Sequence, residues 1–220
     1  MKQSPDAPHS IYGVEKWGKN LIEVTAGGEI GLRNPMAPDA AAISLPDILK
    51  DLDQRGIKAP MILRISSYLE NEIAHINDSF RDAIARTGYN GSYRGVFPIK
   101  VNQQAQVIDR IVAFGKRYNY GLEAGSKPEL VIALAHRLAS EALIVCNGVK
   151  DAEFIQLAIL SRKIGFNTVI VLESPKEADT VIGVYRELGI EPLLGVRVKL
   201  TNQISGKWEE SSGDRSAFGM

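Results

Sequence analysis

The chain has 220 residues, of which 45% are hydrophobic and 24% charged, and 26 basic residues balance 26 acidic ones. This zero net charge gives no indication of nucleic acid or an anionic membrane surface as a partner. A single cysteine excludes an intramolecular disulfide, and the polar N-terminus and the lack of about 18 consecutive apolar residues argue against a signal peptide and a membrane span. We therefore expect a soluble, cytoplasmic protein with one sizeable core.

The N-terminal part is predicted to hold a short β-hairpin. Two β-like runs, at residues 21–24 and 29–32, flank a glycine pair at 27–28 that suits a tight turn. A linker rich in helix breakers follows at residues 35–46. We expect residues 1–43 to form a lead-in and hairpin distinct from what comes next.

Two helices are expected before the pattern changes. The first begins near Ser44 and ends at Gly56, and the second covers residues 66–86 and is closed by Gly88. The second helix carries an apolar stripe at steps of three or four residues, formed by Leu69, Ile73, Ile76, Phe80 and Ile84.

After Asn90, apolar β-like runs alternate regularly with helical segments. The runs cover residues 96–101, 120–124, 143–146, 168–172 and 193–198. Two of the intervening helices begin with capping boxes, Ser126 with Glu129 and Ser174 with Glu177. Such alternation predicts a parallel sheet of βαβ units, and the nearly continuous apolar runs favour a sheet covered on both faces.

The pattern alone leaves two architectures open. Five strands could form a doubly wound open sheet or the first five units of a (β/α)8 barrel, which needs about 250 residues. Pro98 cannot donate a ladder hydrogen bond, so it belongs on an edge strand or at an irregularity near a strand end. The polar residues 203–213 and the ending at Met220 without a closing helix suggest a fragment of a longer protein.

In both architectures ligands bind at the carboxyl ends of the strands. The polar residues expected there are Lys100, Asn102, Glu123, Ser126, Asn147, Lys150, Glu173, Ser174, Arg197 and Lys199. Other signals are missing from the sequence. No Walker loop or G-x-G-x-x-G is present, the three histidines lack metal-ligand spacing, and Cys146 in its apolar run is interpreted as a core residue.

Lys100 directly follows an apolar strand that we expect to be buried. Burial there would favour the neutral, nucleophilic amine that carbonyl chemistry requires. The alternative is a solvated lysine whose stem covers apolar surface. Position alone favours this alternative.

Arg197 and Glu123 each have two interpretations. Arg197 shares a strand face with Lys199, and its anionic partner could be a ligand's phenolate, phosphate or carboxylate, or else Glu123 or Glu173. Glu123 and Asn147 are more often helix caps or partners of loop amides than reactive groups.

An ordered series of segments resembles the biosynthetic arginine decarboxylases. The stretch at residues 96–103, VFPIKVNQ, is very similar to that family's PIKVNQ segment. Further similar stretches are Trp17-Gly18, residues 121–130, 144–148, 150–151, 194–197 and 205–208, and Phe218-Gly219.

The resemblance implies an α/β protein of the alanine-racemase-like type. Residues 44–220 would be the N-terminal part of a (β/α)8 barrel that binds pyridoxal 5′-phosphate (PLP), with about the first five βα units, preceded by the hairpin and helices. Residues 1–43 would contribute to a β domain. Family members convert L-arginine to agmatine and CO2 in polyamine (spermidine) biosynthesis and use PLP and Mg²⁺. The complete form is expected to be a homo-oligomer with its active site at the subunit interface.

The resemblance also implies roles for individual residues. Lys100 would hold PLP as an imine and release the product, which makes it the catalytic candidate. Arg197, near the phenolic oxygen, and Glu123 would be further cofactor-binding residues, and no metal ligand is assigned. PLP would act as the electron sink for the carbanion left by loss of CO2.

Two departures from the family limit this interpretation. Residues 216–219 read Ser-Ala-Phe-Gly where family members commonly have Ser-Lys-Phe-Gly. Family chains are also much longer, and the missing part would supply the ring-stacking histidine, the phosphate loop, the acid at the pyridine nitrogen and the partner subunit's catalytic residues. We expect this chain to be inactive alone and to expose apolar barrel surface. There are two alternatives. One is a decarboxylase of another basic or diamino acid, and the other is a non-catalytic PLP-binding partner subunit.

Overall fold

The computed structural model describes residues 11–199 and 219–220, which fall into two compact units divided between Ile76 and Asn77. Each unit is described by itself. The predicted polar loop at 203–213 and the family-like residues 205–208 and 216–218 lie outside the described residues.

The first unit contains the predicted hairpin. Its elements are α2 (Val14–Trp17), β1 (Ile22–Val24), β2 (Ile30–Leu32), β3 (Ile43–Ser44) and α3 (Leu45–Gln54). β1 and β2 pair antiparallel, as predicted, and β3 adds a third strand from residues expected to be linker. The N-cap residue of α3 is the one predicted, because the Ser44 side chain accepts a hydrogen bond from the Asp47 amide at 3.3 Å.

The helix α4 (Ser66–Thr87) confirms the predicted long helix. Within the first unit, the Tyr68 hydroxyl donates to the Leu21 carbonyl at 2.6 Å and Ile73 is buried. Within the second unit, Phe80 stacks on Tyr93 with ring centroids 4.0 Å apart, although Phe80 stays half-exposed. The predicted apolar stripe is therefore only partly covered.

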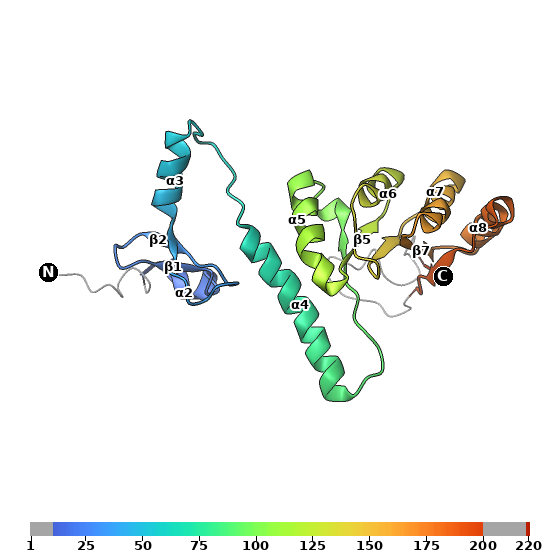
Figure 1. The fold of residues 1–220 in the computed structure, drawn as a ribbon, viewed down its shortest axis with the longest axis horizontal. Helices are drawn as coiled ribbons and strands as arrows, with labels where there is room; N and C mark the ends of the chain where they lie inside the picture. Colours follow the sequence, from blue (N-terminus) through green and yellow to red (C-terminus); the bar gives the residue numbers. More distant parts are fainter. Residues whose placement is uncertain (1–10, 200–218) are drawn as a thin grey trace. The chain divides into compact units, whose positions relative to one another are not determined.

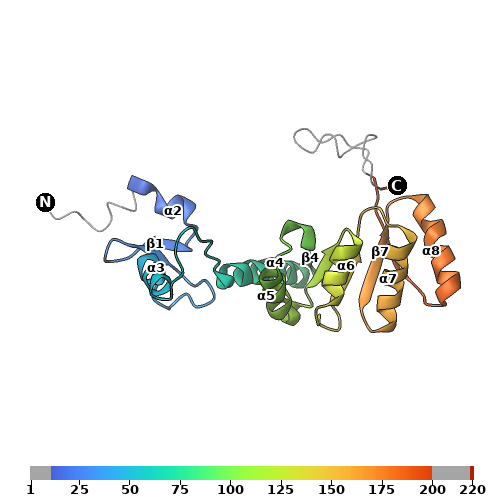
Figure 2. The ribbon, with the colours of Figure 1, turned by 90° about the horizontal axis from the view of Figure 1, so that it is seen from above.

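The second unit is a parallel five-stranded sheet in the order β4-β5-β6-β7-β8. The strands are β4 (Val96–Pro98), β5 (Gly121–Ala124), β6 (Leu143–Cys146), β7 (Asn167–Leu172) and β8 (Leu193–Val196). The helices between them are α5 (Ala105–Gly115), α6 (Lys127–Leu134), α7 (Ala152–Lys163) and α8 (Pro175–Leu188). The predicted alternation of strand and helix is thus confirmed, and Figures 1 and 2 show the helices side by side along the sheet.

Two predicted strands are shorter than expected. The first ends at Pro98, and Ile99–Val101 form a 3₁₀ turn, η1. Pro98 has no amide hydrogen to extend the ladder, so the strand stops there on an edge of the described sheet. The fifth strand ends at Val196 instead of 198.

The capping boxes differ from each other. At α6, the Ser126 hydroxyl accepts from the Glu129 amide at 3.4 Å, as predicted. At α8, the Ser174 side chain makes no capping hydrogen bond, and the Glu177 carboxylate accepts from the Glu173 amide at 2.7 Å instead. The predicted capping box at α8 is therefore confirmed for Glu177 and wrong for Ser174.

The core lies between the sheet and helices α5 to α8, which cover one of its faces (Figure 1). Ile144 and Ile170 of the sheet are fully buried together with Ile155 and Ile159 of α7. On the other face, Val145, Val169 and Val171 are only partly buried, whereas every residue of β5 is buried. Among the described strands, the expected cover on both faces therefore holds for β5 and not for β6 and β7. The open face is the one that can receive a ligand.

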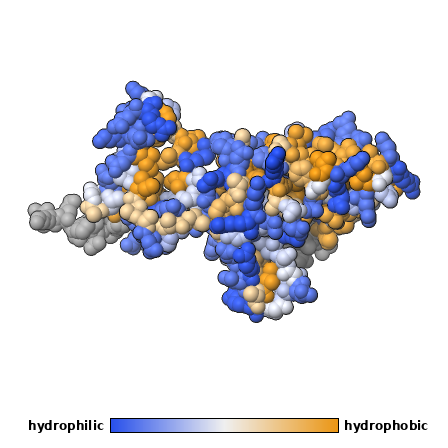
Figure 3. All heavy atoms as spheres, viewed as in Figure 1, coloured by the Kyte–Doolittle hydropathy of each residue, from blue (hydrophilic) through white to orange (hydrophobic). Residues whose placement is uncertain are grey.

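Apolar side chains are exposed along β8 and over the helices. Leu193, Leu194 and Val196 are 38%, 47% and 58% exposed, in line with the apolar barrel surface we expected to be uncovered. Figure 3 shows further apolar patches among the polar side chains around α5 to α8. None of the described helices combines the length and apolar character that crossing a membrane requires.

Cys146 lies in the core, fully buried, as its apolar run predicted. Burial raises the pKa of its thiol from 9.0 to about 12; the nearby Lys150 acts against this rise and Glu123 adds to it. A raised pKa means that the folded state holds this proton more tightly. The contribution of the protonated Cys146 thiol to the stability of the fold is therefore present below pH 9 and is lost as pH rises towards 12.

We expect Cys146 to resist thiol reagents at pH 8 while the chain is folded and to react fully after denaturation. A colorimetric thiol titration with and without denaturant measures this. Rapid labelling of the folded chain would contradict the burial of the thiol.

Candidate active site

An open cavity of about 1120 Å³ lies at the carboxyl end of the second unit's sheet. Four of the ten polar residues predicted for strand ends line it, namely Lys100, Glu123, Asn147 and Arg197. The other six are absent from its lining: Asn102, Ser126, Lys150, Glu173, Ser174 and Lys199. The cavity's walls also include Val96 and Val171 of the open sheet face.

Lys100 stands in η1, one residue beyond a fully buried Ile99. Its side chain is 64% exposed, and its Nζ lies 3.9 Å from Oε1 of Glu123. The buried alternative for Lys100 is therefore wrong, and the solvated lysine that position alone favoured is confirmed. The 3₁₀ turn after Pro98 places Ile99 in the core and leaves the next side chain at the open cavity. What remains is a primary amine that a ligand can reach.

Glu123 lies on β5, in register with Pro98 of β4 and Val145 of β6. Its side chain is only 6% exposed, and none of the described residues donates a hydrogen bond to its Oε1. The role of capping α6 belongs instead to Glu129, whose Oε2 accepts from the Gly125 amide at 2.8 Å. A buried carboxylate oxygen without a donor is costly, so it indicates a site where a cation or a donor group belongs.

Arg197 follows β8 and reaches the edge of the same cavity. One guanidinium nitrogen, Nη1, lies 3.3 and 3.4 Å from the two carboxylate oxygens of Glu173. Glu173 is 3% exposed at its side chain, whereas Arg197 is 48% exposed. Of the two carboxylates considered as partners, Glu173 is the one contacted, and the guanidinium still faces the cavity.

The turn after β6 brings the backbone close to the neighbouring turn. Gly148 has a φ of +77°, and an added Cβ would lie 3.2 Å from the Gly125 carbonyl oxygen. Its amide donates to Oε1 of Glu173 at 2.9 Å. Only glycine fits this conformation and this contact without strain.

A family model named "Pyridoxal-dependent decarboxylase, pyridoxal binding domain" matches residues 71–220. The chain belongs to this family. This membership makes PLP the cofactor that its cavity should accept. The family's cofactor requires a primary amine at the site, and Lys100 supplies one in the described lining.

The chain is similar over most of its length to biosynthetic arginine decarboxylases. It is 46% identical to that of Thermosynechococcus vestitus over 96% of this chain and 33% of the relative. Identity to the Nostoc sp. protein of the same name is 43%, over 96% of this chain and 31% of that one. The chain thus spans about a third of the length of the curated relatives it matches.

The solved biosynthetic arginine decarboxylase of Campylobacter jejuni shares the fold, with a TM-score of 0.78 and 33% identity. The match covers 86% of this chain and 31% of the Campylobacter chain. Together with the family match, it assigns the five-stranded sheet to the N-terminal part of a PLP-binding barrel. The choice that the sequence pattern left open is settled in favour of the barrel.

The cavity fits one side of PLP better than the other. The Lys100 amine is open to a carbonyl group of a ligand, and the Glu123 Oε1 beside it has no hydrogen-bond donor among the described residues. The half-exposed Arg197 suits an anionic oxygen of a ligand. Within the described lining, Lys100 and Arg197 are the only basic residues, so no further cation is at hand for the phosphate.

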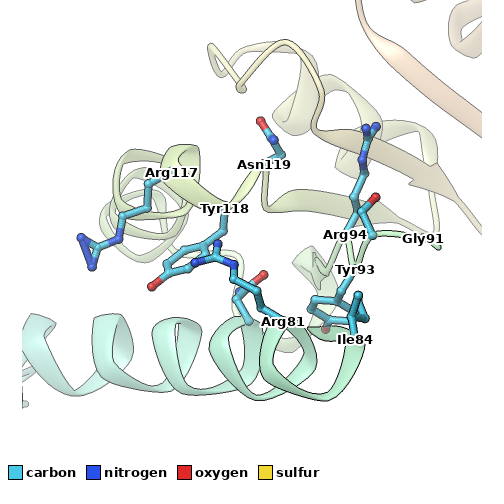
Figure 4. A pocket seen from close by; sticks show the side chains of 10 residues that line it. Arg81, Ile84, Gly91, Tyr93, Arg94, Arg117, Tyr118 and Asn119 are labelled. Atoms are coloured by element: carbon cyan, nitrogen blue, oxygen red, sulfur yellow. The ribbon is translucent and has the colours of Figure 1, made fainter. Parts of the chain in front are cut away.

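A smaller pocket of about 280 Å³ lies at the amino ends of β4 and β5 (Figure 4). It contains three arginines, each of which already has a partner. Arg94 pairs with Glu141 at 2.7 Å, Arg81 lies 5.4 Å from the Tyr118 ring centre, and Arg117 packs on Phe114. We assign it no chemistry. No group of three or more potential metal ligands occurs among the described side chains.

Sequence reasoning missed one pair of site-supporting residues. Lys150 was noted only as a strand-end residue and Glu177 only as half of a capping box. In the structure, Nζ of Lys150 lies 3.3 Å from Oε2 of Glu177, and the Lys150 side chain is fully buried. Their spacing of 27 residues carries no local signal.

Proposed function

We propose that the chain is the cofactor-carrying N-terminal part of an enzyme that decarboxylates L-arginine to agmatine and CO2 with PLP. The observation that carries the proposal is the exposed Lys100 amine 3.9 Å from the buried Glu123 carboxylate, whose Oε1 accepts no hydrogen bond from the described residues. The choice of arginine rests on the relatives, whose printed name is biosynthetic arginine decarboxylase. In a cell this activity would belong to polyamine (spermidine) synthesis in the cytoplasm.

Each site residue has a distinct task in the proposed reaction. Lys100 would hold the cofactor through its amine. Glu123, 3.9 Å from Nζ, stabilises positive charge at that nitrogen and can accept its proton. Arg197, held by Glu173, would bind the cofactor's phenolic oxygen. When bound, PLP supplies the electron sink for the charge left by loss of CO2.

The remainder of the proposal concerns the complete protein. Residues 44–220 would form the N-terminal part of the barrel, and residues 1–43 would contribute to a β domain. Mg²⁺ is a second proposed cofactor and a homo-oligomer the proposed assembly, both on the resemblance to the arginine decarboxylases. The groups that hold the phosphate would come from the part of the relatives that this chain does not span.

The test compares the 220-residue chain with a chimera that adds the remaining length of the Thermosynechococcus relative, which is 46% identical. Both are incubated with PLP, Mg²⁺ and arginine, lysine, ornithine or diaminopimelate, and CO2 and amine products are measured. We expect no turnover by the chain alone and agmatine formation by the chimera. Steady CO2 release from arginine by the short chain would contradict its inactivity, and a preference for another substrate would contradict arginine as the substrate.

A further inference from the structure

A second layer of charge lies beneath the cavity, formed by Lys150, Glu177 and Glu173. Their side chains are 0%, 7% and 3% exposed, so all three are buried. None of them lines the cavity, and the proposed reaction uses neither Lys150 nor Glu177 directly. Buried charges need balanced partners, because desolvation of an uncompensated one costs several kcal/mol.

Glu177 connects the turn after β6 with the start of α8. Its Oε1 accepts from the Lys150 amide at 2.9 Å and its Oε2 from the Glu173 amide at 2.7 Å. The Lys150 ammonium lies 3.3 Å from Oε2 and also donates to the Gly148 carbonyl. The Lys150–Glu177 pair thereby holds two backbone segments that flank the Glu173 side chain, at Lys150 and at Glu173 itself.

Glu173 carries the connection to the cavity. Its Oε1 accepts from the Gly148 amide at 2.9 Å, and both its oxygens lie within 3.4 Å of the Arg197 guanidinium. The chain of contacts therefore runs from Lys150 through Glu177 and Glu173 to Arg197. The four described side chains of this network are two cations and two carboxylates.

We propose that Lys150 is a positioning residue. Through Glu177 and Glu173, it keeps the positively charged guanidinium of Arg197 at the edge of the cavity. Because Lys150 neutralises Glu177, Glu173 presents its buried negative charge to Arg197 without a second uncompensated carboxylate behind it. Its guanidinium then stays at the cavity edge, half-exposed, where it can meet an anionic oxygen of the ligand. The identity of that ligand as PLP rests on the proposed function, whereas the coupling of Lys150 to Arg197 does not.

Removing the charge of either Lys150 or Glu177 tests this coupling, because the two changes should shift the Arg197 guanidinium in opposite directions. Lys150→Met leaves an extra negative charge, which should draw the Arg197 guanidinium inward and slow hydrogen exchange at its Nε–H. Glu177→Gln removes a negative charge and should speed that exchange. The double variant Lys150→Met/Glu177→Gln restores neutrality, so its Arg197 signal should return close to that of the unmodified chain. The ¹H–¹⁵N NMR signal of Arg197 in the 220-residue chain reports all three.

Glu129→Gln is the matched control. Glu129 occupies the same position in α6 as Glu177 does in α8, and each accepts the amide four residues before it. The control should disturb the Gly125 amide and leave the Arg197 signal unchanged. If Lys150→Met fails to fold, the neutral double variant and Glu177→Gln still test the proposal. An Arg197 signal in the double variant that moves further than in Glu177→Gln would overturn it.

PLP titration separates this inference from the proposed function. We expect Lys150→Met to weaken PLP binding about tenfold and the double variant to recover most of that loss. If the unmodified chain does not bind PLP while the NMR signals shift as described, the proposed function fails and the positioning role stands. If PLP binds and no single variant changes the Arg197 signal or the affinity, the positioning role is wrong.

Discussion

Replacing Lys100 by alanine is expected to abolish the absorbance at about 420 nm that PLP should develop when it joins a lysine amine. Lys100 is the lysine whose side chain lines the cavity, 64% exposed and 3.9 Å from Glu123. Without its amine no covalent link to the cofactor can form there. Borohydride reduction followed by peptide mass spectrometry should find the cofactor on Lys100 in the unmodified chain and on no residue in the variant.

Lys127→Ala is the control for this experiment. Lys127 is 39% exposed, lies outside the cavity lining and pairs with Asp151 at 2.8 Å and Glu153 at 2.7 Å. Its loss should leave the absorbance and the labelled peptide unchanged. Undiminished absorbance in Lys100→Ala, or cofactor fixed mainly at another lysine, would show that Lys100 has been assigned wrongly.

Replacing Gly121 by alanine is expected to produce the largest loss of stability. Gly121 opens β5 between two neighbouring strands, and a Cβ there would lie 1.9 Å from the Leu143 carbonyl oxygen and 2.9 Å from its backbone nitrogen. Both are backbone atoms, so no side-chain rotation can relieve the contact, and β5 and β6 must move apart. We expect a loss of about 3 kcal/mol or more in the free energy of unfolding, measured by chemical denaturation.

Gly183→Ala makes the same chemical change without the steric conflict. Gly183 lies within α8 with nothing inside 4 Å of the added Cβ. Because alanine favours a helix over glycine, this variant should gain about 0.5–1 kcal/mol. A Gly121→Ala variant as stable as Gly183→Ala would rule out the close approach of β5 to β6.

Much of the second unit's architecture could be predicted from local patterns. Apolar runs, helix caps such as Ser126, and the regular alternation define βαβ units without any long-range information. The predicted strand ends were wrong for β4 and β8, the two edge strands of the described sheet. The strand ends early, at Pro98, and the turn that follows exposes Lys100, in agreement with the solvated alternative.

The partners of the site residues could not be predicted in the same way. Arg197 had two candidate carboxylates, and only the arrangement of β7 beside β8 places Glu173 within 3.3 Å of it. The Lys150–Glu177 pair joins two turns that are far apart in sequence. Such contacts depend on strand register, which no single segment encodes.

By itself, the sequence determined the class of fold, a parallel α/β sheet, and, through the segment around Lys100, the family and the lysine to test. The tertiary structure decided which polar groups meet at the cavity and how exposed each one is. The physical reason is that helix capping and apolar periodicity depend on residues near one another in sequence. The charge balance around Arg197, by contrast, is set by side chains that only the packed strands bring together.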